Sequence, residues 1–278
     1  MSSHQRFVHI DVIKGVAIFL VVLGHVYYFA ADRHTDTIWF FLVSSWHMPA
    51  FMMLAGYFSA KPLDLRPRGV WKYWRGKMER LLLPLLFIPL LFNWVQHGFS
   101  VALPLNMYLF NYWFTYVLFL IFGLFYLHRL GEGWLARLLK LEANPKRWLL
   151  DICISFLVIW LIHQLRFYVE VHHPGLYKPT HAQNIDWLYK YFLLGYWMKC
   201  YPKLEEMMKN ELVGMFAFFV LVLSAYAAFA LGMDWADGII LTLSGLFFSY
   251  FAVYQFVSGG GAQTQSLHVF SPIWVKSR

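Results

Sequence analysis

Cysteine and charge are both scarce in this chain, and each shortage excludes a class of protein. The 278 residues include two cysteines, Cys153 and Cys200, both in or beside apolar segments. Two such cysteines indicate neither a disulfide framework nor a thiolate metal site. Charged residues make up 14% of the chain, whereas a soluble domain has about 25%. The scarcity of charge therefore excludes an ordinary soluble domain.

Several catalytic signatures are also missing. The chain has no glycine-rich phosphate loop, no serine-based nucleophile elbow and no zinc motif, which argues against the enzymes that depend on them. No internal repeat is visible, and this argues mildly against a secondary transporter, because many transporters have duplicated halves. The first apolar run is too long for a signal peptide, carries charges and lacks a small-x-small cleavage site.

Apolar residues dominate instead: 60% of the chain is hydrophobic and 21% is aromatic. A spanning helix needs about 20 apolar residues, so the long apolar runs predict an all-α, polytopic membrane helix bundle with about eight transmembrane helices. This membrane domain covers residues 1–257, and residues 258–278 form a short C-terminal tail. We place the eight spans at residues 8–31, 38–58, 81–97, 107–128, 148–165, 185–200, 212–232 and 238–257.

The basic residues indicate the orientation of these spans. Of the 23 lysines and arginines, 18 fall on one side of the predicted membrane and four on the other, and Lys14 lies inside the first span. Basic residues concentrate in cytoplasmic loops, so both termini are predicted to be cytoplasmic. The net charge of +8 does not indicate nucleic-acid binding, because the basic residues alternate between loops. We expect a multi-pass protein of the plasma (inner) membrane.

The first span carries three ionisable residues, Asp11, Lys14 and His25. Ionisable groups at membrane depth are costly and usually face a bundle interior or a wet cavity. Lys14 and His25 are 11 positions apart, so they share one helix face at a separation of about 16 Å. Asp11 lies on the same stripe, three residues before Lys14, where the two could form a structural pair.

Four stretches of the chain, taken in order, are DVIKGVAIFLVVLGH (11–25), HMPAFMMLAGYF (47–58), WRGKMERLLLPLL (74–86) and YWFTYVLF (112–119). Together they resemble the acyltransferase-3 family of integral-membrane acyltransferases. A fifth, YFLLGYW at 191–197, is a weaker match, and together the stretches cover most of residues 6–200. The amino-acid sequences of the second and third stretches resemble the glucan-succinyltransferase branch of the family.

This resemblance implies transfer of an acetyl or succinyl group from acyl-CoA to a hydroxyl of a cell-envelope glycan, a glucan or a lipid-linked sugar. It implies no tightly bound cofactor and no metal. The alternative that the residues leave open is a transporter of a small organic anion, with Lys14 and His25 as substrate or proton sites. Binding of coenzyme A would distinguish the two, because a transporter has no use for it.

The chain departs from the family pattern in three ways. Lys14 stands where the family usually has Arg. Lysine keeps the positive charge but lacks the planar guanidinium group, whose forked N–H donors bind anions in a bidentate way. Ala55 stands where the second motif usually has Ser. The family usually has ten spans, so we expect a chain that is either truncated or a shorter variant, and SLHVF in the tail resembles the start of a missing ninth helix.

His25 is the strongest catalytic candidate, with Lys14 and Asp11 beside it on the same helix. A free imidazole titrates near neutrality and can take a proton from a hydroxyl. We therefore expect His25 to act as the general base that activates the acceptor. The alternative is a structural histidine between helices, and Lys14 acts either on the donor or as a structural partner of Asp11.

The remaining candidates are weaker. Arg75, Lys77 and Arg80 match the family position best for binding the phosphates of acyl-CoA, although positive-inside bias alone would also produce this basic run. The outer-loop histidines show no metal-binding spacing, and we expect a solvated loop there. A possible acceptor site comprises His47, Trp113, Tyr116, His163 and Arg166, for each of which a role in packing or in the loop is the alternative.

Overall fold

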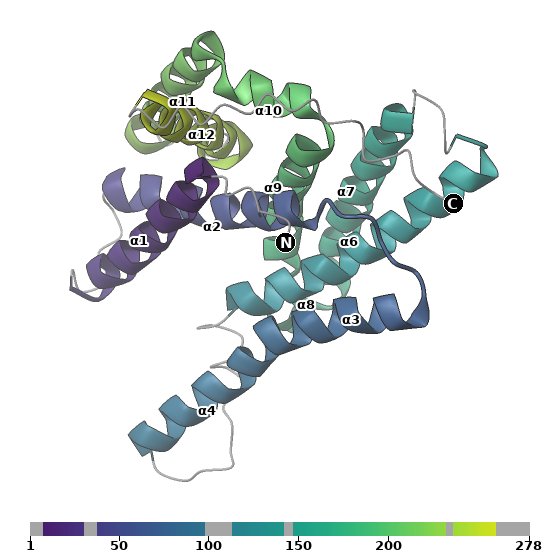
Figure 1. The fold of residues 1–278 in the computed structure, drawn as a ribbon. Helices are drawn as coiled ribbons and strands as arrows, with labels where there is room; N and C mark the ends of the chain where they lie inside the picture. Colours follow the sequence, from purple (N-terminus) through teal and green to yellow (C-terminus); the bar gives the residue numbers. More distant parts are fainter. Residues whose placement is uncertain (1–7, 31–37, 98–112, 142–146, 232–235, 260–278) are drawn as a thin grey trace. The chain divides into compact units, whose positions relative to one another are not determined.

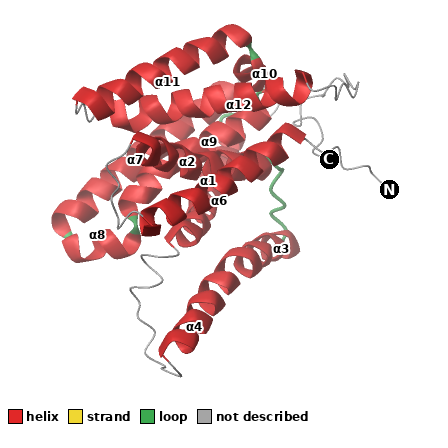
Figure 2. Ribbon diagram, turned by 90° about the vertical axis from the view of Figure 1, so that its left-hand side faces the viewer, coloured by secondary structure: helices red, strands yellow, loops and turns green. Residues whose placement is uncertain are grey.

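The computed structural model describes residues 8–30, 38–97, 113–141, 147–231 and 236–259, and every element within these ranges is a helix (Figure 2). This confirms the all-α fold. Five of the helical segments are long and apolar enough to cross a membrane. They are Val8–Tyr27, Trp113–Leu138, Arg147–His172, Glu211–Ala228 and Gly238–Ser258.

The other three predicted spans are also helical. Residues 38–58 lie in α2 (Ile38–Ser59), which contains Pro49. Residues 81–97 lie in a short π-helix, η1 (Met78–Leu82), and in α4 (Leu83–His97). Residues 185–200 lie in α9 (Ala182–Cys200). α4 has 15 residues and so reaches about 22 Å, less than the roughly 30 Å of a bilayer core.

The chain divides into two compact units, with boundaries after Ala60 and, inside α9, after Lys190. The first unit contains α1 (Val8–Ala30), α2, the end of α9, α10 (Pro202–Lys209), α11 (Glu211–Leu231), η2 (Ala236–Ile240) and α12 (Leu241–Gly259). The second contains α3 (Pro67–Lys77), η1, α4, α6 (Trp113–Leu138), α7 (Arg147–His172), α8 (Pro174–Thr180) and the start of α9. The predicted tail from residue 260 lies outside the described residues.

In the first unit, α1 and α12 pack on α2, and α11 lies beside α12 (Figures 1 and 2). Two glycines let α2 and α9 approach closely: a Cβ added to Gly56 would overlap the carbonyl of Phe192, and one added to Gly195 would overlap the carbonyl of Met53. Small residues at helix crossings of this kind are typical of membrane bundles. The aromatic rings of Phe218 and Phe248 join α11 to α12, with centroids 4.8 Å apart.

In the second unit, α6 and α7 extend beyond their predicted ends. The prediction placed Arg129 and Arg137 in a loop, but α6 continues to Leu138. A buried carboxylate explains the extension at Arg129. The side chain of Glu132 is 1% exposed and pairs with Arg129 of its own helix and with Arg147 of α7, whose Nη2 lies 3.2 Å from Oε1 of Glu132. Ion pairing of this kind lets a charged helical turn remain inside a bundle.

Candidate active site

The three ionisable residues of α1 fall into two separate groups. Nζ of Lys14 lies 3.4 Å from Oδ1 of Asp11, so the structure forms the pair expected from their i,i+3 spacing. The Lys14 ammonium also lies 4.2 Å from the centre of the Phe58 ring of α2, within the range of a cation–π contact. Lys14 is therefore held by its own helix and by the end of α2, some three turns away from His25.

His25 lies exposed on α1, and Nδ1 is 2.8 Å from the carbonyl oxygen of Val21. A carbonyl oxygen can only accept a hydrogen bond, so Nδ1 must carry the hydrogen. In the neutral ring, Nε2 then carries the lone pair. The local helix thus selects the tautomer that presents a basic nitrogen away from the backbone, which is the form that a general base requires.

The three predicted donor-binding residues are not held alike. The exposed Arg75 has Nε 2.6 Å from Oε1 of Glu79, one turn along the helix. Lys77 points the other way, with Nζ 3.2 Å from the centre of the Phe122 ring of α6. Arg80 is exposed in η1. Burial, together with the charges of Arg80 and Lys61, lowers the pKa of Lys77 to about 8.

Four of the five predicted acceptor residues gather around the start of α9 in the second unit. The rings of Trp113 and Tyr116, on the first turn of α6, lie 6.2 Å and 6.0 Å from the ring of His181, and Trp113 stacks on it. Nδ1 of His163 lies 3.0 Å from Oδ2 of Asp186, and Nη1 of Arg166 lies 3.5 Å from the same oxygen. His47 is half-buried in α2 of the first unit.

The prediction missed His181 and Asp186, which join these residues. The sequence places His181 in a region interpreted as a solvated loop and Asp186 near the start of a span. His181 adopts a left-handed backbone, with φ of 51°, and ends α8 just before α9 begins. The Asp186 side chain is 9% exposed, whereas that of His163 is 55% exposed. The carboxylate is thus buried beneath an imidazole that is open to its surroundings.

The same chain matches a known family over nearly its whole length. Residues 7–273 match the family described as "Acyltransferase domain" (Acyl_transf_3). The chain belongs to the acyltransferase-3 family. This confirms the resemblance seen in the motifs.

Two curated relatives match a smaller part of this acyltransferase-3 chain. Nodulation protein NolL of Sinorhizobium fredii is 33% identical over 90 residues, which is 31% of this chain and 24% of the relative. Nodulation protein NolL of Mesorhizobium japonicum is 34% identical over 93 residues, again 31% of this chain and 24% of the relative. The matched part thus spans about a quarter of the length of these relatives. No solved structure matches the chain.

A second polar cluster of this acyltransferase-3 chain lies inside the second unit, and the sequence pattern did not predict it, because its polar residues are isolated in the chain. The His128 ring of α6 lies between Tyr189 of α9 and Ser155 of α7. Its Nδ1 is 2.9 Å from the Tyr189 hydroxyl, and its Nε2 is 3.5 Å from Oγ of Ser155. All three side chains are buried. The cluster satisfies polar groups between three helices, which membrane bundles require.

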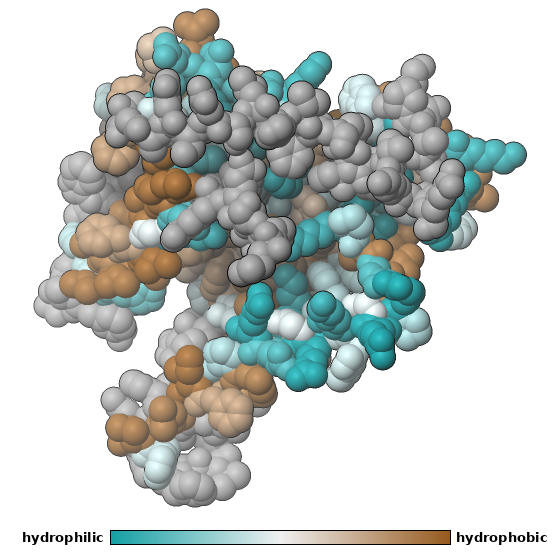
Figure 3. Space-filling model, in the orientation of Figure 1, coloured by the Kyte–Doolittle hydropathy of each residue, from teal (hydrophilic) through white to brown (hydrophobic). Residues whose placement is uncertain are grey.

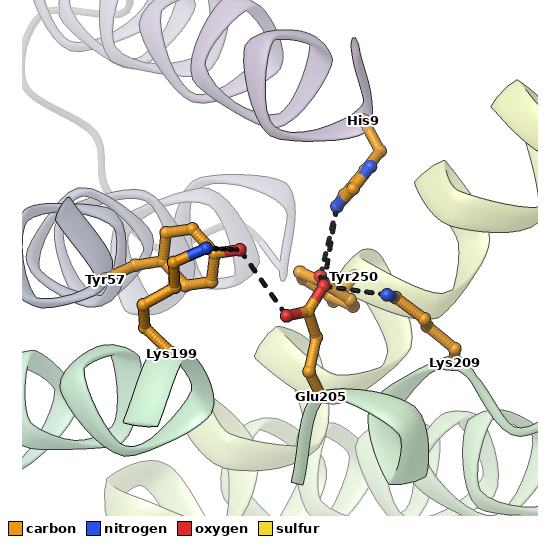
Figure 4. A network of polar contacts seen from close by, with 6 residues as sticks. All are labelled: His9, Tyr57, Lys199, Glu205, Lys209 and Tyr250. Carbon is orange, nitrogen blue, oxygen red and sulfur yellow. Dashed lines mark hydrogen bonds and ion pairs between the residues drawn. The ribbon is translucent and has the colours of Figure 1, made fainter. Parts of the chain in front are cut away.

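A third cluster centres on Glu205 of α10 in the first unit (Figure 4). Oε1 of Glu205 lies 2.7 Å from Nζ of Lys209 and accepts a hydrogen bond of 2.9 Å from the Tyr250 hydroxyl of α12. The Tyr57 hydroxyl of α2 donates to Oε2 at 3.4 Å. His9 of α1 lies 3.2 Å from the Tyr250 hydroxyl. His9 Nε2 also lies 3.9 Å from Oε1 of Glu205. One carboxylate therefore links α10 to α1, α2 and α12.

We expect Glu205→Gln to lower the free energy of unfolding by about 2–3 kcal/mol, because it leaves Lys209 without its ion pair in a half-buried position. Thermal unfolding in detergent would measure the change, and the exposed Glu206→Gln is the matched control.

Burial alone would raise the pKa of Glu205, but its hydrogen bond with Lys209 and the Lys209 charge hold this pKa below the ordinary value of 4.5. Its stabilising effect is thus complete above about pH 4.5 and is lost as the pH falls through the lower folded value. Equal unfolding of the two variants at neutral pH would contradict this prediction.

Proposed function

We propose that this membrane acyltransferase moves an acetyl or succinyl group from acyl-CoA to a hydroxyl of a cell-envelope glycan or lipid-linked sugar, in the plasma (inner) membrane. The family match across residues 7–273 carries the proposal, because it includes α1 and its exposed, tautomer-fixed His25. Membership of an acyltransferase family favours this reaction over transport of a small organic anion.

His25 is the general base of this proposal. Its Nε2 takes the proton of the acceptor hydroxyl as that oxygen attacks the thioester carbonyl. The bond between oxygen and the acyl carbon forms, and the bond between that carbon and sulfur breaks. Coenzyme A leaves as a thiolate, which takes up a proton to become the free thiol. The products are an ester on the acceptor and coenzyme A.

Lys14 and Asp11 have another role in this scheme. Three helical turns separate Lys14 from His25, so Lys14 does not orient the imidazole directly. Its ammonium is fixed between the Asp11 carboxylate and the Phe58 ring. A charge held in this way suits an anionic or strongly polar part of the donor, and Arg at the same position would serve as well.

Lys77 and Arg80 are the better placed of the predicted donor-binding residues. Arg80 is exposed, and it does not share the ion pair with Glu79 that holds Arg75. The Lys77 ammonium sits on an aromatic ring and carries a lowered pKa, so a phosphate would offer it an anionic partner that the ring does not supply. Phosphate would compete with Glu79 for Arg75.

The acceptor side of the proposal uses the start of α9. Trp113 and His181 present stacked rings, and His163, Arg166 and Asp186 present polar groups beside them. A sugar offers apolar ring faces together with hydroxyls, and an aromatic surface with a few convergent polar groups matches both. The positive-inside orientation assigns this end of the second unit to the outer side of the membrane.

The proposed reaction is tested with membranes that contain the chain and with acetyl-CoA or succinyl-CoA carrying an isotope label in the acyl group. Mass spectrometry of the envelope glycans should detect labelled ester only when both the chain and the acyl-CoA are present. A chain that leaves the glycans unlabelled and binds no coenzyme A, yet takes up a small organic anion, would overturn the proposal.

Donor affinity should depend on the protonation of Lys77. Its pKa of about 8 means that the ammonium is mostly charged at pH 7 and mostly neutral at pH 9, so acyl-CoA affinity should fall as the pH rises through 8. Lys77→Arg should keep the affinity at pH 9, because guanidinium stays charged. Lys77→Gln should weaken binding at pH 7 by about tenfold or more.

Calorimetric titration with acyl-CoA at several pH values measures this dependence. Lys72→Arg is the matched control, since Lys72 belongs to the same helix and is exposed. It should bind as the parent does at each pH. A parental affinity that stays constant from pH 7 to 9 would remove Lys77 from the donor site.

A further inference from the structure

α3 presents two different faces, and its inward face is already occupied. The Trp74 ring lies 5.9 Å from that of Phe119 and 5.6 Å from that of Tyr126, both on α6. The Tyr73 hydroxyl donates to the carbonyl oxygen of Phe122 at 3.4 Å. These aromatic contacts, together with Lys77 over Phe122, fix the rotation of α3 about its own axis.

The outward face of α3 consists of Arg68, Trp71, Lys72 and Arg75, which share a face at i, i+3, i+4 and i+7 spacing. All four are exposed, and Trp71 is 64% exposed. Arg75 pairs with Glu79, whereas Arg68 and Lys72 have no ion-pair partner within the described part of the chain. Three cations therefore surround one exposed indole.

The chain next to this outward face is strongly apolar. α4 follows after η1, and Figure 1 shows the helix changing direction between α3 and α4. Figure 3 shows hydrophilic side chains gathered over α3 and hydrophobic ones over α4. The exposed apolar side chains of α4 include Leu83, Leu86, Phe87, Ile88 and Leu91. About two helical turns separate Arg75, the last cation of the outward face, from Leu83, the first of these exposed apolar side chains. This change from charged to apolar side chains places α3 at the membrane surface.

We propose that the outward face of α3 binds the headgroups of anionic lipids. Its cations are opposite in charge to the lipid phosphates, and anionic lipids attract basic segments beside a membrane span. Trp71 lies among these cations, at the headgroup level that tryptophan prefers. The inward Lys77 points to α6, and Arg80 belongs to η1, so Arg75, which is paired with Glu79, is the predicted donor-binding residue that also lies on this face. The test therefore leaves Arg75 in place and changes Arg68 and Lys72. The proposal does not depend on the transferred acyl group.

The test uses the full chain in detergent micelles, titrated with phosphatidylglycerol brominated near its headgroup and, separately, with brominated phosphatidylcholine. Bromine quenches nearby tryptophan, and subtracting the signal of Trp71→Phe isolates the contribution of Trp71. Phosphatidylglycerol should quench Trp71 at a lower concentration than phosphatidylcholine. The double variant Arg68→Gln/Lys72→Gln should need about 25 times more phosphatidylglycerol, about fivefold for each cation removed.

The matched control, Lys140→Gln/Lys203→Gln, removes two exposed cations elsewhere and should titrate as the parent does. Equal quenching by the two lipids, or an equal shift in both double variants, would overturn the proposal. Unchanged acyl-CoA affinity in Arg68→Gln/Lys72→Gln supports it. A loss of acyl-CoA affinity with unchanged quenching would assign this face to the donor and would also overturn the proposal.

Discussion

Replacing His25 with Gln should lower the turnover number by about 10²- to 10⁴-fold, the usual contribution of a general base. Glutamine keeps a polar side chain of similar length and can donate to the Val21 carbonyl as Nδ1 of His25 does. It cannot accept a proton at neutral pH. Donor affinity should therefore stay close to that of the parent, and the loss should appear in kcat.

The acid side of the rate–pH profile gives a second readout. A rate that depends on a general base falls at low pH, where a base takes up a proton. His25→Gln should lose this dependence along with most of its rate. Turnover of labelled acyl-CoA by the purified variant, measured across pH at saturating donor, would show both effects.

His172 provides a matched control for His25. It is an exposed histidine near a helix end, and its Nδ1 lies 3.2 Å from the carbonyl oxygen of Tyr168, four residues earlier. His172→Gln therefore makes the same chemical change in the same local geometry and should keep the parental rate. A His25→Gln variant with parental turnover would return His25 to a structural role.

Adding a methyl group at Gly195 should have the largest effect on folding. Gly195→Ala places a Cβ on the carbonyl of Met53, and Gly56→Ala places one on the carbonyl of Phe192. Backbone atoms cannot move aside as a flexible side chain can, so α2 and α9 must separate. We expect a loss of about 3 kcal/mol or more in the free energy of unfolding, at the upper end of overpacking costs.

Gly15 is the control for this prediction. A Cβ at Gly15 of α1 has no neighbour within 4 Å, so Gly15→Ala should be neutral or should stabilise its helix slightly. The melting temperatures of the three variants in one detergent make the comparison. If Gly195→Ala unfolds at the same temperature as Gly15→Ala, α2 and α9 do not pack as closely as the structure shows, and the prediction is contradicted.

Local patterns in the sequence predicted the features that depend on local geometry. Apolar run length predicted the helices, and five of the eight expected spans are long and apolar enough to cross a membrane. The i,i+3 spacing predicted the pair of Asp11 and Lys14, because helix geometry alone brings such residues together. The ordered motifs identified the family that residues 7–273 match.

Tertiary packing decided the contacts between distant segments. His9 and Tyr250, 241 positions apart, meet because α1 and α12 pack near one another, and no periodicity encodes that pairing. The opposite directions of Arg75 and Lys77 depend on which face of α3 meets α6. Likewise, His181 and Asp186 join the predicted acceptor residues only because α6, α7 and α9 meet there. A sequence records the period of each helix, whereas the rotation and neighbours of that helix depend on how whole side-chain surfaces fit together.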